Sequence, residues 1–108
     1  MYLTQYNMGL FSFSNEFEVA VNHPKEDVYE KFTAYIRKKG WAIISAEQAE
    51  NVSFQTKTTL ISWPIDFTVN FNSVDENSTK LSVSISAAHL DLGRSKGIIN
   101  DIIKEIYG

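Results

Sequence analysis

The sequence predicts a two-layer α+β domain, in which an antiparallel sheet of about five strands carries two helices on one face. Several stretches alternate apolar and polar residues with a period of two, as half-buried strands do. Two other stretches carry apolar residues at helical spacing, one after the first strand and one at the end of the chain. Short connections favour antiparallel neighbours among the later strands. Because every strand has a single apolar face, both helices should cover the same side, in the order β-α-β-β-β-β-α.

The length, composition and net charge of the chain limit the class of protein. At 108 residues the chain is long enough for one domain with one core. Its 10 basic and 13 acidic residues give a net charge of −3, which argues against a nucleic-acid partner because phosphate binding needs clustered Lys and Arg. The absence of cysteine excludes disulfides, thiolate chemistry and cysteine-ligated zinc. No stretch approaches the roughly 18 apolar residues of a membrane span, and the first residues lack the features of a secretory signal, so we expect a cytoplasmic protein without a membrane span.

The beginning of the chain differs from the rest. Residues 1–10 are polar and aromatic by turns, with a break at Gly9, and we expect a loose arm or a short edge strand there. The domain itself should span residues 11–108. Its first strand is expected over residues 11–21, where Phe and Val alternate mainly with Ser and Glu.

A helix should follow the first strand. Pro24 fits its first turn, because the N–H that proline lacks has no partner there. Glu26 and Asp27 suit the positive end of the helix dipole, and Gly40 is a typical residue just after a helix end. The apolar stripe that this helix should bury consists of Val28, Phe32, Tyr35 and Ile36.

Four strands should follow this helix. They are expected over residues 41–46, 52–58, 65–72 and 80–87. Pro64 must lie at a bend, a bulge or an edge, since it cannot donate a hydrogen bond to a neighbouring strand. Residues 75–78, Asp-Glu-Asn-Ser, have the composition of a hairpin turn. The strand face that the helices leave uncovered is rich in Ser, Thr, Asn and Gln and should face solvent.

The end of the chain should form an amphipathic helix over residues 97–107. Its apolar stripe consists of Ile98, Ile102 and Ile106, which recur every four residues, and of Ile99 and Ile103, which widen it. Five isoleucines need a large apolar surface, and the predicted sheet supplies one.

Residues 19–29 read Val-Ala-Val-Asn-His-Pro-Lys-Glu-Asp-Val-Tyr, and Phe32 follows. This stretch resembles the START-like helix-grip superfamily, often called SRPBCC. Members of that superfamily often combine an aliphatic first strand, a proline-opened helix and a C-terminal helix gripped by the sheet. The resemblance covers residues 11–107 and implies the same architecture for this chain.

Two further stretches resemble a small bacterial branch of this superfamily that has no described function. Ser62-Trp63 resembles a Ser-Trp-Gly turn, with Pro64 in place of the glycine. Residues 90–94 resemble an Asp-aromatic-Gly-Lys motif before the last helix, with Leu92 in place of the aromatic residue. Larger relatives bind lipids, sterols or polyketides in a cavity between sheet and helix. This chain lacks much of their length, which argues against a large cavity.

The resemblance implies a site for a small apolar ligand between the sheet and the last helix. The residues expected to line it are Trp63, Tyr29, Tyr35, Ile99 and Ile102. Trp63 would stack on the ligand or gate its entrance, although a tryptophan beside a proline more often closes the end of a core. The two tyrosines would turn their hydroxyls into the cavity, or reach solvent while their rings pack.

The start of the last helix is a candidate anion site. Backbone N–H groups at a helix N-terminus can bind phosphate or carboxylate, and Arg94, Ser95 and Lys96 lie beside them. The spacing is not that of a phosphate-binding P-loop. The simpler interpretation, which we favour, is a solvated connector in which Asp91 or Ser95 caps the helix.

The two histidines do not form a convincing catalytic or metal site. His89 and Asp91 lie two residues apart and could pair as an oriented base, but no nucleophile or metal ligand is near them in the sequence. His23 precedes Pro24 and belongs to the start of the first helix. Two distant histidines without an acidic cluster make a poor metal site, so we expect no metal, no cofactor and no catalytic residue.

These observations favour a non-catalytic binding or interaction domain, which would hold a small apolar ligand or a protein partner and be a monomer or a homodimer. Two alternatives stay open. A small-molecule enzyme of the helix-grip superfamily would require His89, Asp91, Arg94 and Trp63 to converge on one pocket. A structural oligomerisation domain would leave an apolar patch uncovered by either helix.

Overall fold

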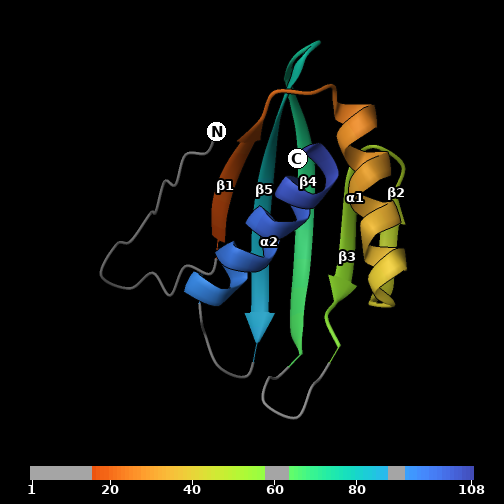
Figure 1. The fold of residues 1–108 in the computed structure, drawn as a ribbon, viewed down its shortest axis with the longest axis vertical. Coiled ribbons are helices and arrows are strands. Elements are labelled where there is room, and N and C mark those ends of the chain that lie inside the picture. Colours follow the sequence, from red (N-terminus) through yellow and green to blue (C-terminus); the bar gives the residue numbers. More distant parts are fainter. Residues whose placement is uncertain (1–15, 58–63, 88–91) are drawn as a thin grey trace.

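The computed structural model describes residues 16–57, 64–87 and 92–108. These residues form an α+β fold of five antiparallel strands and two helices, in the predicted order (Figure 1). The strands are β1 (Glu16–Val21), β2 (Ala42–Glu47), β3 (Asn51–Gln55), β4 (Ile65–Asp75) and β5 (Ser78–Ala87), and the helices are α1 (Lys25–Lys39) and α2 (Leu92–Tyr107). The predictions for residues 1–10, for the first strand before Glu16, and for Trp63, His89 and Asp91 lie outside the described residues.

The strands form one sheet in the order β1-β5-β4-β3-β2, in which every neighbouring pair is antiparallel. β2 to β5 lie side by side in chain order, as their short connections predict. β1 instead pairs with β5, so the first and last strands of the chain are neighbours. The pairing aligns apolar side chains in rows across the sheet, one of which consists of Phe17, Val83, Val69 and Val52.

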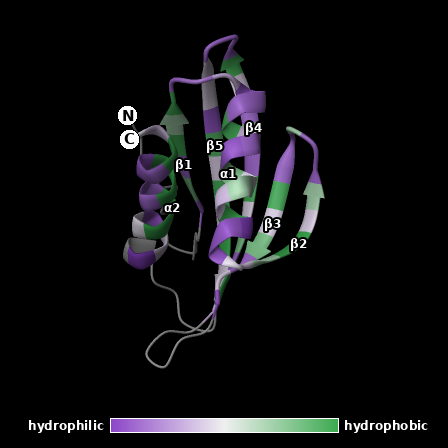
Figure 2. Cartoon of the chain, turned by 45° about the vertical axis from the view of Figure 1, so that its right-hand side comes forward, coloured by the Kyte–Doolittle hydropathy of each residue, from purple (hydrophilic) through white to green (hydrophobic). Residues whose placement is uncertain are grey.

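Both helices pack on one face of this sheet (Figure 1), and Figure 2 shows hydrophobic and hydrophilic residues alternating along the strands. The buried apolar side chains of the sheet and the helices form a single core cluster. The opposite face carries polar side chains that pair across strands, as in the hydrogen bonds Ser53–Thr68 at 3.1 Å and Gln55–Asp66 at 2.7 Å. The predicted two-layer arrangement, with one face of the sheet toward solvent, is confirmed.

Aromatic rings fill the space between α1 and the sheet. Phe32 of α1 is fully buried and meets Phe54 and Phe71 edge-on, with ring centroids 5.9 and 5.6 Å apart. Phe54 in turn stacks on Phe67 at 5.0 Å and on Trp41 at 5.9 Å. Edge-on and offset-stacked contacts are the favoured arrangements of aromatic pairs, so these rings fix α1 on β3 and β4.

Helix α1 begins and ends where the sequence predicts. The Pro24 carbonyl accepts a hydrogen bond from the N–H of Val28 at 3.0 Å, and Gly40 ends the helix with a φ of 75°, which favours glycine. The buried residues of this helix are Val28, Tyr29, Phe32, Thr33 and Ile36. Tyr35, which belongs to the predicted stripe, is only half-buried. The buried arc is centred on Phe32 and Ile36, and Tyr35 lies about a quarter turn from its centre.

Helix α2 starts at Leu92, earlier than the predicted start at residue 97. Ser95 extends the buried side of the helix by one turn, although its side chain is polar. The predicted apolar stripe is also less buried than expected, since Ile99 and Ile102 are fully buried whereas Ile98, Ile103 and Ile106 are half-buried. Successive helical residues turn by about 100°, so the five isoleucines cover a wider arc than the contact with the sheet. Neither described helix is long and apolar enough to cross a membrane.

Two large apolar side chains of the described residues are exposed, and both lie at irregularities of the sheet. Ile44 is 62% exposed in β2, where the pairing with β3 shifts between Ile43 and Ser45. Val74 is 65% exposed in β4, at a similar shift against β5. An extra residue at such a shift bulges the strand and redirects its side chain. A bulge in the edge strand β2 also hinders pairing with the edge of another sheet.

Candidate functional site

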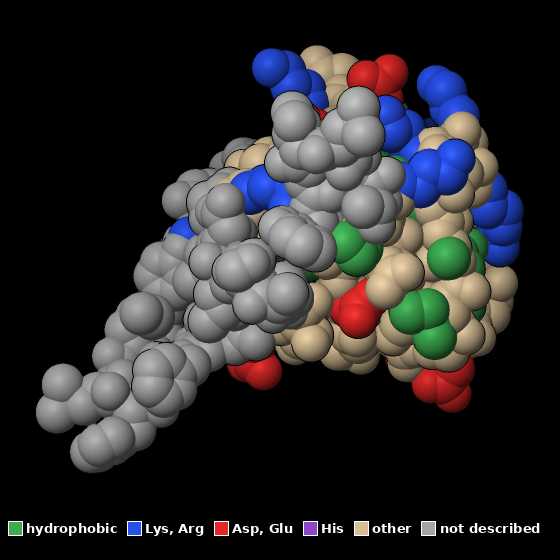
Figure 3. Space-filling model, turned by 90° about the horizontal axis from the view of Figure 1, so that it is seen from below, with side chains coloured by type: hydrophobic (Ala, Val, Ile, Leu, Met, Phe, Trp, Pro, Cys, Tyr) green, Lys and Arg blue, Asp and Glu red, His purple; other side chains and the backbone are tan. Residues whose placement is uncertain are grey.

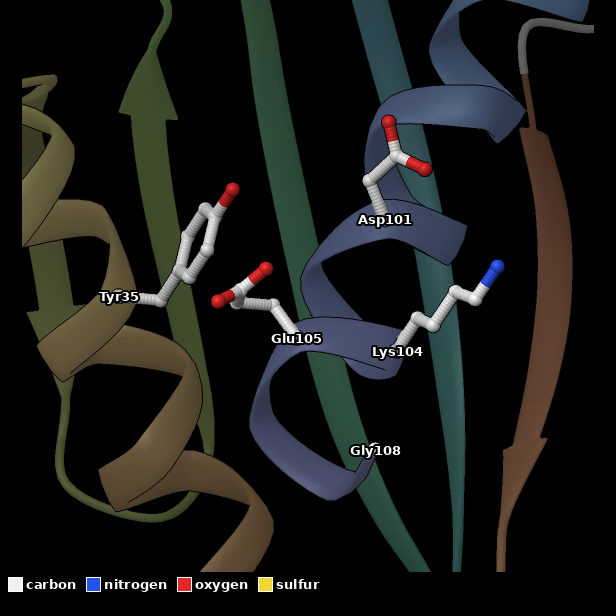
Figure 4. Close-up of a pocket in the computed structure, with 5 residues that line it drawn as sticks. All are labelled: Tyr35, Asp101, Lys104, Glu105 and Gly108. Atoms are coloured by element: carbon white, nitrogen blue, oxygen red, sulfur yellow. The ribbon is translucent and has the colours of Figure 1, made fainter.

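A groove runs between α1 and α2 on the helical side of the molecule. Two adjoining hollows of about 450 and 290 Å³ form it, and Tyr35 and Glu105 line both of them. The larger hollow is also lined by Asp101, Lys104 and Gly108, and the smaller one by Lys31, Ala34, Lys38 and Ile106. We call these nine residues the interhelical groove. Figure 4 shows the larger hollow, with Tyr35 on α1 opposite Glu105 and Asp101 on α2.

The walls of the groove follow from helical spacing. On α1, Lys31, Tyr35 and Lys38 stand four and three residues apart and therefore share one side of the helix. On α2, Asp101 and Glu105 are one turn apart and share a side in the same way. Both sides lie next to the buried arcs of their helices, so they face one another above the sheet.

The two walls differ in charge. The α1 wall contributes Lys31 and Lys38, whereas the α2 wall contributes Asp101 and Glu105 together with Lys104. Seen from below, Lys and Arg side chains gather along the α1 side of the molecule (Figure 3), and the last turn of α1 is rich in them. In the described part of the chain no ion pair crosses the groove, and the pair that involves a groove residue joins Lys31 to Asp27 within α1 at 3.5 Å.

Tyr35 stands at the centre of the groove. Its ring is half-buried and packs edge-on against Trp41, with centroids 6.1 Å apart. Burial raises the pKa of its phenol above the usual value of 10.0, and the carboxylates of Glu105 and Asp101 raise it further, while Lys38 acts in the opposite direction. The phenol therefore stays protonated at neutral pH and can both donate and accept a hydrogen bond in the groove.

A cluster of four side chains joins the C-terminal end of α2 to the start of α1. The hydroxyl of Tyr107 donates a hydrogen bond to Asp27 Oδ2 at 2.6 Å. Its ring stacks on His23, with centroids 3.7 Å apart and planes within 5° of parallel. Lys31 Nζ lies 5.6 Å from the centre of the same ring. We call Tyr107, Asp27, His23 and Lys31 the Tyr107 clamp.

The hydrogen bond of the clamp changes the acidity of both its partners. Donation by Tyr107 is the main reason why the pKa of the Asp27 carboxyl lies below its usual value of 3.8; partial burial opposes this effect and Lys31 adds to it. Burial raises the pKa of the Tyr107 phenol well above its usual value of 10.0, and the bond to Asp27 raises it further. Sequence analysis missed the clamp, because Tyr107 and Asp27 are 80 residues apart and no local pattern connects them.

A third hollow lies on the other side of α2. Its volume is about 370 Å³, and it is lined by Asn100, Ile103, Lys104, Tyr107 and Gly108. Lys104 is the one charged side chain among these residues, so this hollow lacks the opposed charges of the interhelical groove.

The residues predicted to line a ligand site lie partly in the core and partly at the interhelical groove. Tyr29 is 5% exposed and meets Phe71 edge-on at 5.1 Å, and Ile99 and Ile102 are fully buried in the core. None of the three hollows reaches these side chains. Tyr35 does line a hollow, and Trp63 lies outside the described residues.

The predicted anion-binding residues occupy the first turns of α2 but point in different directions. Ser95 is 1% exposed, and its Oγ has no hydrogen-bond partner in the described part of the chain. Lys96 Nζ lies 6.0 Å from the centre of the Phe17 ring, on the β1 side of the helix. Because successive residues of a helix turn by about 100°, Arg94, Ser95 and Lys96 do not share one side of it. Their role in anion binding stays a prediction.

The histidines likewise give no assembled site among the described residues. His23 belongs to the Tyr107 clamp, and His89 and Asp91 lie outside the described residues. In residues 16–57, 64–87 and 92–108, no group of three or more His, Asp or Glu side chains is arranged to hold a metal ion.

No protein-family model matches this chain, and no curated protein matches it. No groove residue can therefore receive a role by transfer from a relative. The chemistry of the described side chains has to carry the assignment of function.

Proposed function

We propose that this domain is a non-catalytic binding module of the START-like helix-grip type, whose ligand lies in the interhelical groove. The observation that carries the proposal is the hollow of about 450 Å³ between α1 and α2, which Tyr35 lines from one side and Asp101 and Glu105 from the other (Figure 4). Small-molecule sites commonly have volumes of about 300–1,000 Å³ and a few converging polar groups. The groove meets both conditions.

The ligand would lie beside α2 and not beneath it. In the larger proteins that the chain resembles, ligands lie between the sheet and the last helix. Here Ile99 and Ile102 occupy that space and pack into the core. A ligand beneath α2 would have to displace both side chains, and the burial of each is worth roughly 1.5–3 kcal/mol. A ligand in the groove displaces neither.

The polar groups of the groove suit binding better than catalysis. A nucleophile or general base is normally activated by a partner within about 2.6–3.2 Å. In the described part of the chain, Tyr35, Asp101 and Glu105 have no hydrogen bond to another side chain. The raised pKa of Tyr35 also makes its phenol a weak acid at neutral pH. These groups can orient a ligand through charge and hydrogen bonds without transferring a proton.

A substitution that fills the groove tests the proposal. Ala34 is exposed and lines the smaller hollow, so Ala34→Trp places an indole ring in the groove. Ala46→Trp adds the same side chain to the exposed edge strand β2 and serves as the matched control. Native mass spectrometry of proteins purified without detergent should show a bound small molecule on the wild type and on Ala46→Trp, and none on Ala34→Trp.

The other outcomes of this measurement contradict the proposal in different ways. If Ala34→Trp keeps the bound mass, the ligand lies elsewhere in the molecule. If the wild type carries no added mass, ligand binding is refuted for the purified protein. A dimer without added mass would instead support the oligomerisation alternative and direct attention to Ile44 on the outer edge of β2. Equal thermal unfolding midpoints of the three proteins exclude misfolding as the cause.

A further inference from the structure

The two outer edges of the described sheet, β1 and β2, differ in their protection against pairing with another strand (Figure 2). Charged side chains and prolines commonly provide such protection. β1 carries Glu16 and Glu18. Residues 42–46 of β2, Ala-Ile-Ile-Ser-Ala, include neither a charge nor a proline. Among the described residues no strand lies on the outer side of β2, so its outward N–H and C=O groups are available to a partner strand.

Ile44 lies at the middle of this edge. Its side chain is 62% exposed, and it is the extra residue of the bulge against β3. A bulge bends and twists its strand, which hinders pairing with an ordinary straight strand. A second copy of β2 carries the same bulge at the same place. In a two-fold pair the bulges would meet near the symmetry axis, and the two Ile44 side chains would cover one another.

The charges at the two ends of β2 are self-complementary. Lys39 lies just before the strand, and Glu47 ends it. An antiparallel partner strand places its end beside the start of β2, so Lys39 of each copy would lie near Glu47 of the other. In the described part of the chain neither side chain has an ion pair.

The outer flank of α1 repeats this pattern. α1 contacts β2, and its groove side, which carries Tyr35, faces α2. Successive helical residues turn by about 100°, so Glu30 and Arg37 share the opposite flank, on the side of β2. Both are exposed, and neither has an ion pair among the described residues. An antiparallel second copy would bring Arg37 to Glu30 at two symmetric places.

We infer that β2 is a homodimer interface, in which two copies of the chain pair their β2 strands antiparallel about a two-fold axis near Ile44. The two sheets then form one continuous sheet, with both α1 helices on the same face. A second copy fits better than an unrelated protein, because it supplies the matching bulge and the reversed charges of both patterns. The interhelical groove lies on the other side of α1 and stays open, so the inference is independent of the proposed ligand binding.

The predicted interface is small, since each copy contributes one short strand and one flank of a helix. Interfaces that bury less than about 1,200 Å² in total are typical of weak, transient complexes. We therefore expect a dissociation constant in the micromolar range and a dimer that forms and dissociates with the protein concentration.

Sedimentation velocity of the full chain from about 1 to 500 µM tests the inference. The wild type should change from monomer to dimer over this range. Ile44→Lys places two like charges together at the symmetry axis and should weaken association at least about tenfold. Val74→Lys makes the same change at an equally exposed apolar position of β4, away from the interface, and should leave association unchanged.

Charge reversal tests the orientation of the two copies. Arg37→Glu sets Glu30 against a second carboxylate, and Glu30→Lys sets Arg37 against a second cation. Each variant alone should therefore dimerise about three- to tenfold more weakly than the wild type. An equimolar mixture of the two variants should regain dimer, because both pairs of a mixed dimer have opposite charges again. Added salt should weaken this recovery.

Hydrogen exchange locates the contact. As the protein concentration rises, amide exchange should slow in residues 42–47 and stay unchanged in β1. A wild type that remains a monomer at every concentration overturns the inference and leaves this edge to a strand of another protein. A dimer that Ile44→Lys and Val74→Lys affect equally, or that the mixed charge variants fail to regain, lies elsewhere on the molecule and also overturns it. Equal unfolding midpoints of the monomeric variants at low concentration exclude misfolding as the cause.

Discussion

Helices α1 and α2 lie on the same face of the same sheet, yet they are held there in different ways. α1 buries five side chains over its length, namely Val28, Tyr29, Phe32, Thr33 and Ile36. Among the described side chains of α2, Ser95, Ile99 and Ile102 are buried, although this helix has the more apolar sequence. Hollows border α2 on both sides. An apolar stripe indicates how much surface a helix can bury, and its neighbours decide how much it does bury.

Because α1 and α2 are held on the sheet differently, the two walls of the interhelical groove are not anchored equally. Aromatic contacts between α1 and the strands fix the wall that carries Tyr35 and Lys38. The wall that carries Asp101 and Glu105 depends on Ile99, on Ile102 and on the Tyr107 clamp. Substitutions in the two helices should therefore have effects of different size.

Truncation of the central ring of α1 should have the largest effect. Phe32→Ala removes a fully buried ring that touches Phe54 and Phe71, and should lower the free energy of unfolding by about 3–5 kcal/mol. Ile102→Ala should cost about 2–3 kcal/mol, at the low end for a buried isoleucine, because the hollows beside α2 let the helix settle. Urea unfolding followed by circular dichroism measures both values.

The exposed Glu30→Ala on α1 is the control for this pair and should stay within about 0.5 kcal/mol of the wild type. A larger loss for Ile102→Ala than for Phe32→Ala would reverse the comparison and make α2 the better anchored helix.

Removal of one oxygen atom from the Tyr107 clamp should lower the free energy of unfolding by an intermediate amount. Tyr107→Phe keeps the ring on His23 but deletes the hydrogen bond to Asp27, which should cost about 1 kcal/mol at neutral pH. Because the folded-state pKa of Asp27 lies below 3.8, this contribution is present above that value and is lost as pH falls through the lowered pKa. Because the pKa of Tyr107 lies above 10.0, the contribution also persists up to about pH 10 and is lost only at higher pH.

Thermal unfolding of wild type and Tyr107→Phe across the acid range measures this pH dependence. The difference between their midpoints should be constant from about pH 5 to 9 and shrink in stronger acid. A difference that grows as the pH falls would contradict the assignment of Asp27 as the ionised acceptor.

Removal of the buried hydroxyl of α2 should have the smallest effect and the opposite sign. Ser95→Ala deletes an Oγ without a partner in the described structure and introduces a better helix former, so stability should rise by up to about 1 kcal/mol. Asn100→Ala, at an exposed position of the same helix, gains helix propensity alone and is the matched control. A loss of stability in Ser95→Ala, in the same urea measurement, would show that this hydroxyl has a binding partner.

Local patterns in the sequence predict the elements of this fold well, because each pattern reflects chemistry within a few residues. The alternation of apolar residues such as Phe and Val with polar residues predicts the strands, and Pro24 and Gly40 predict the limits of α1. The start of α2 was missed because Ser95 and Gly97 interrupt the apolar pattern, and contact with the sheet outweighs their weak helix propensity.

The candidate site was predicted less completely, because it depends on how the two helices lie relative to one another. Tyr35 was expected to line a site because the resemblance to the helix-grip superfamily implied a cavity between the sheet and the last helix. Asp101, Glu105 and Lys38 fall on the polar sides of their helices, where charged residues are ordinary. Their opposition across a groove follows from tertiary packing, which no local period contains.

The pairing of β1 with β5 also sets an order of assembly. Glu16 and Ser84, which are register partners in these strands, are separated by 68 residues, whereas β2 to β5 form hairpins between neighbours. Closing a long loop costs more chain entropy than closing a hairpin, so β1 should join the sheet after the hairpins have formed. During synthesis on the ribosome, α1 emerges before the strands that cover Val28, Phe32 and Ile36. The apolar side of α1 therefore stays without its partner strands, and open to aggregation, until the last strands leave the exit tunnel.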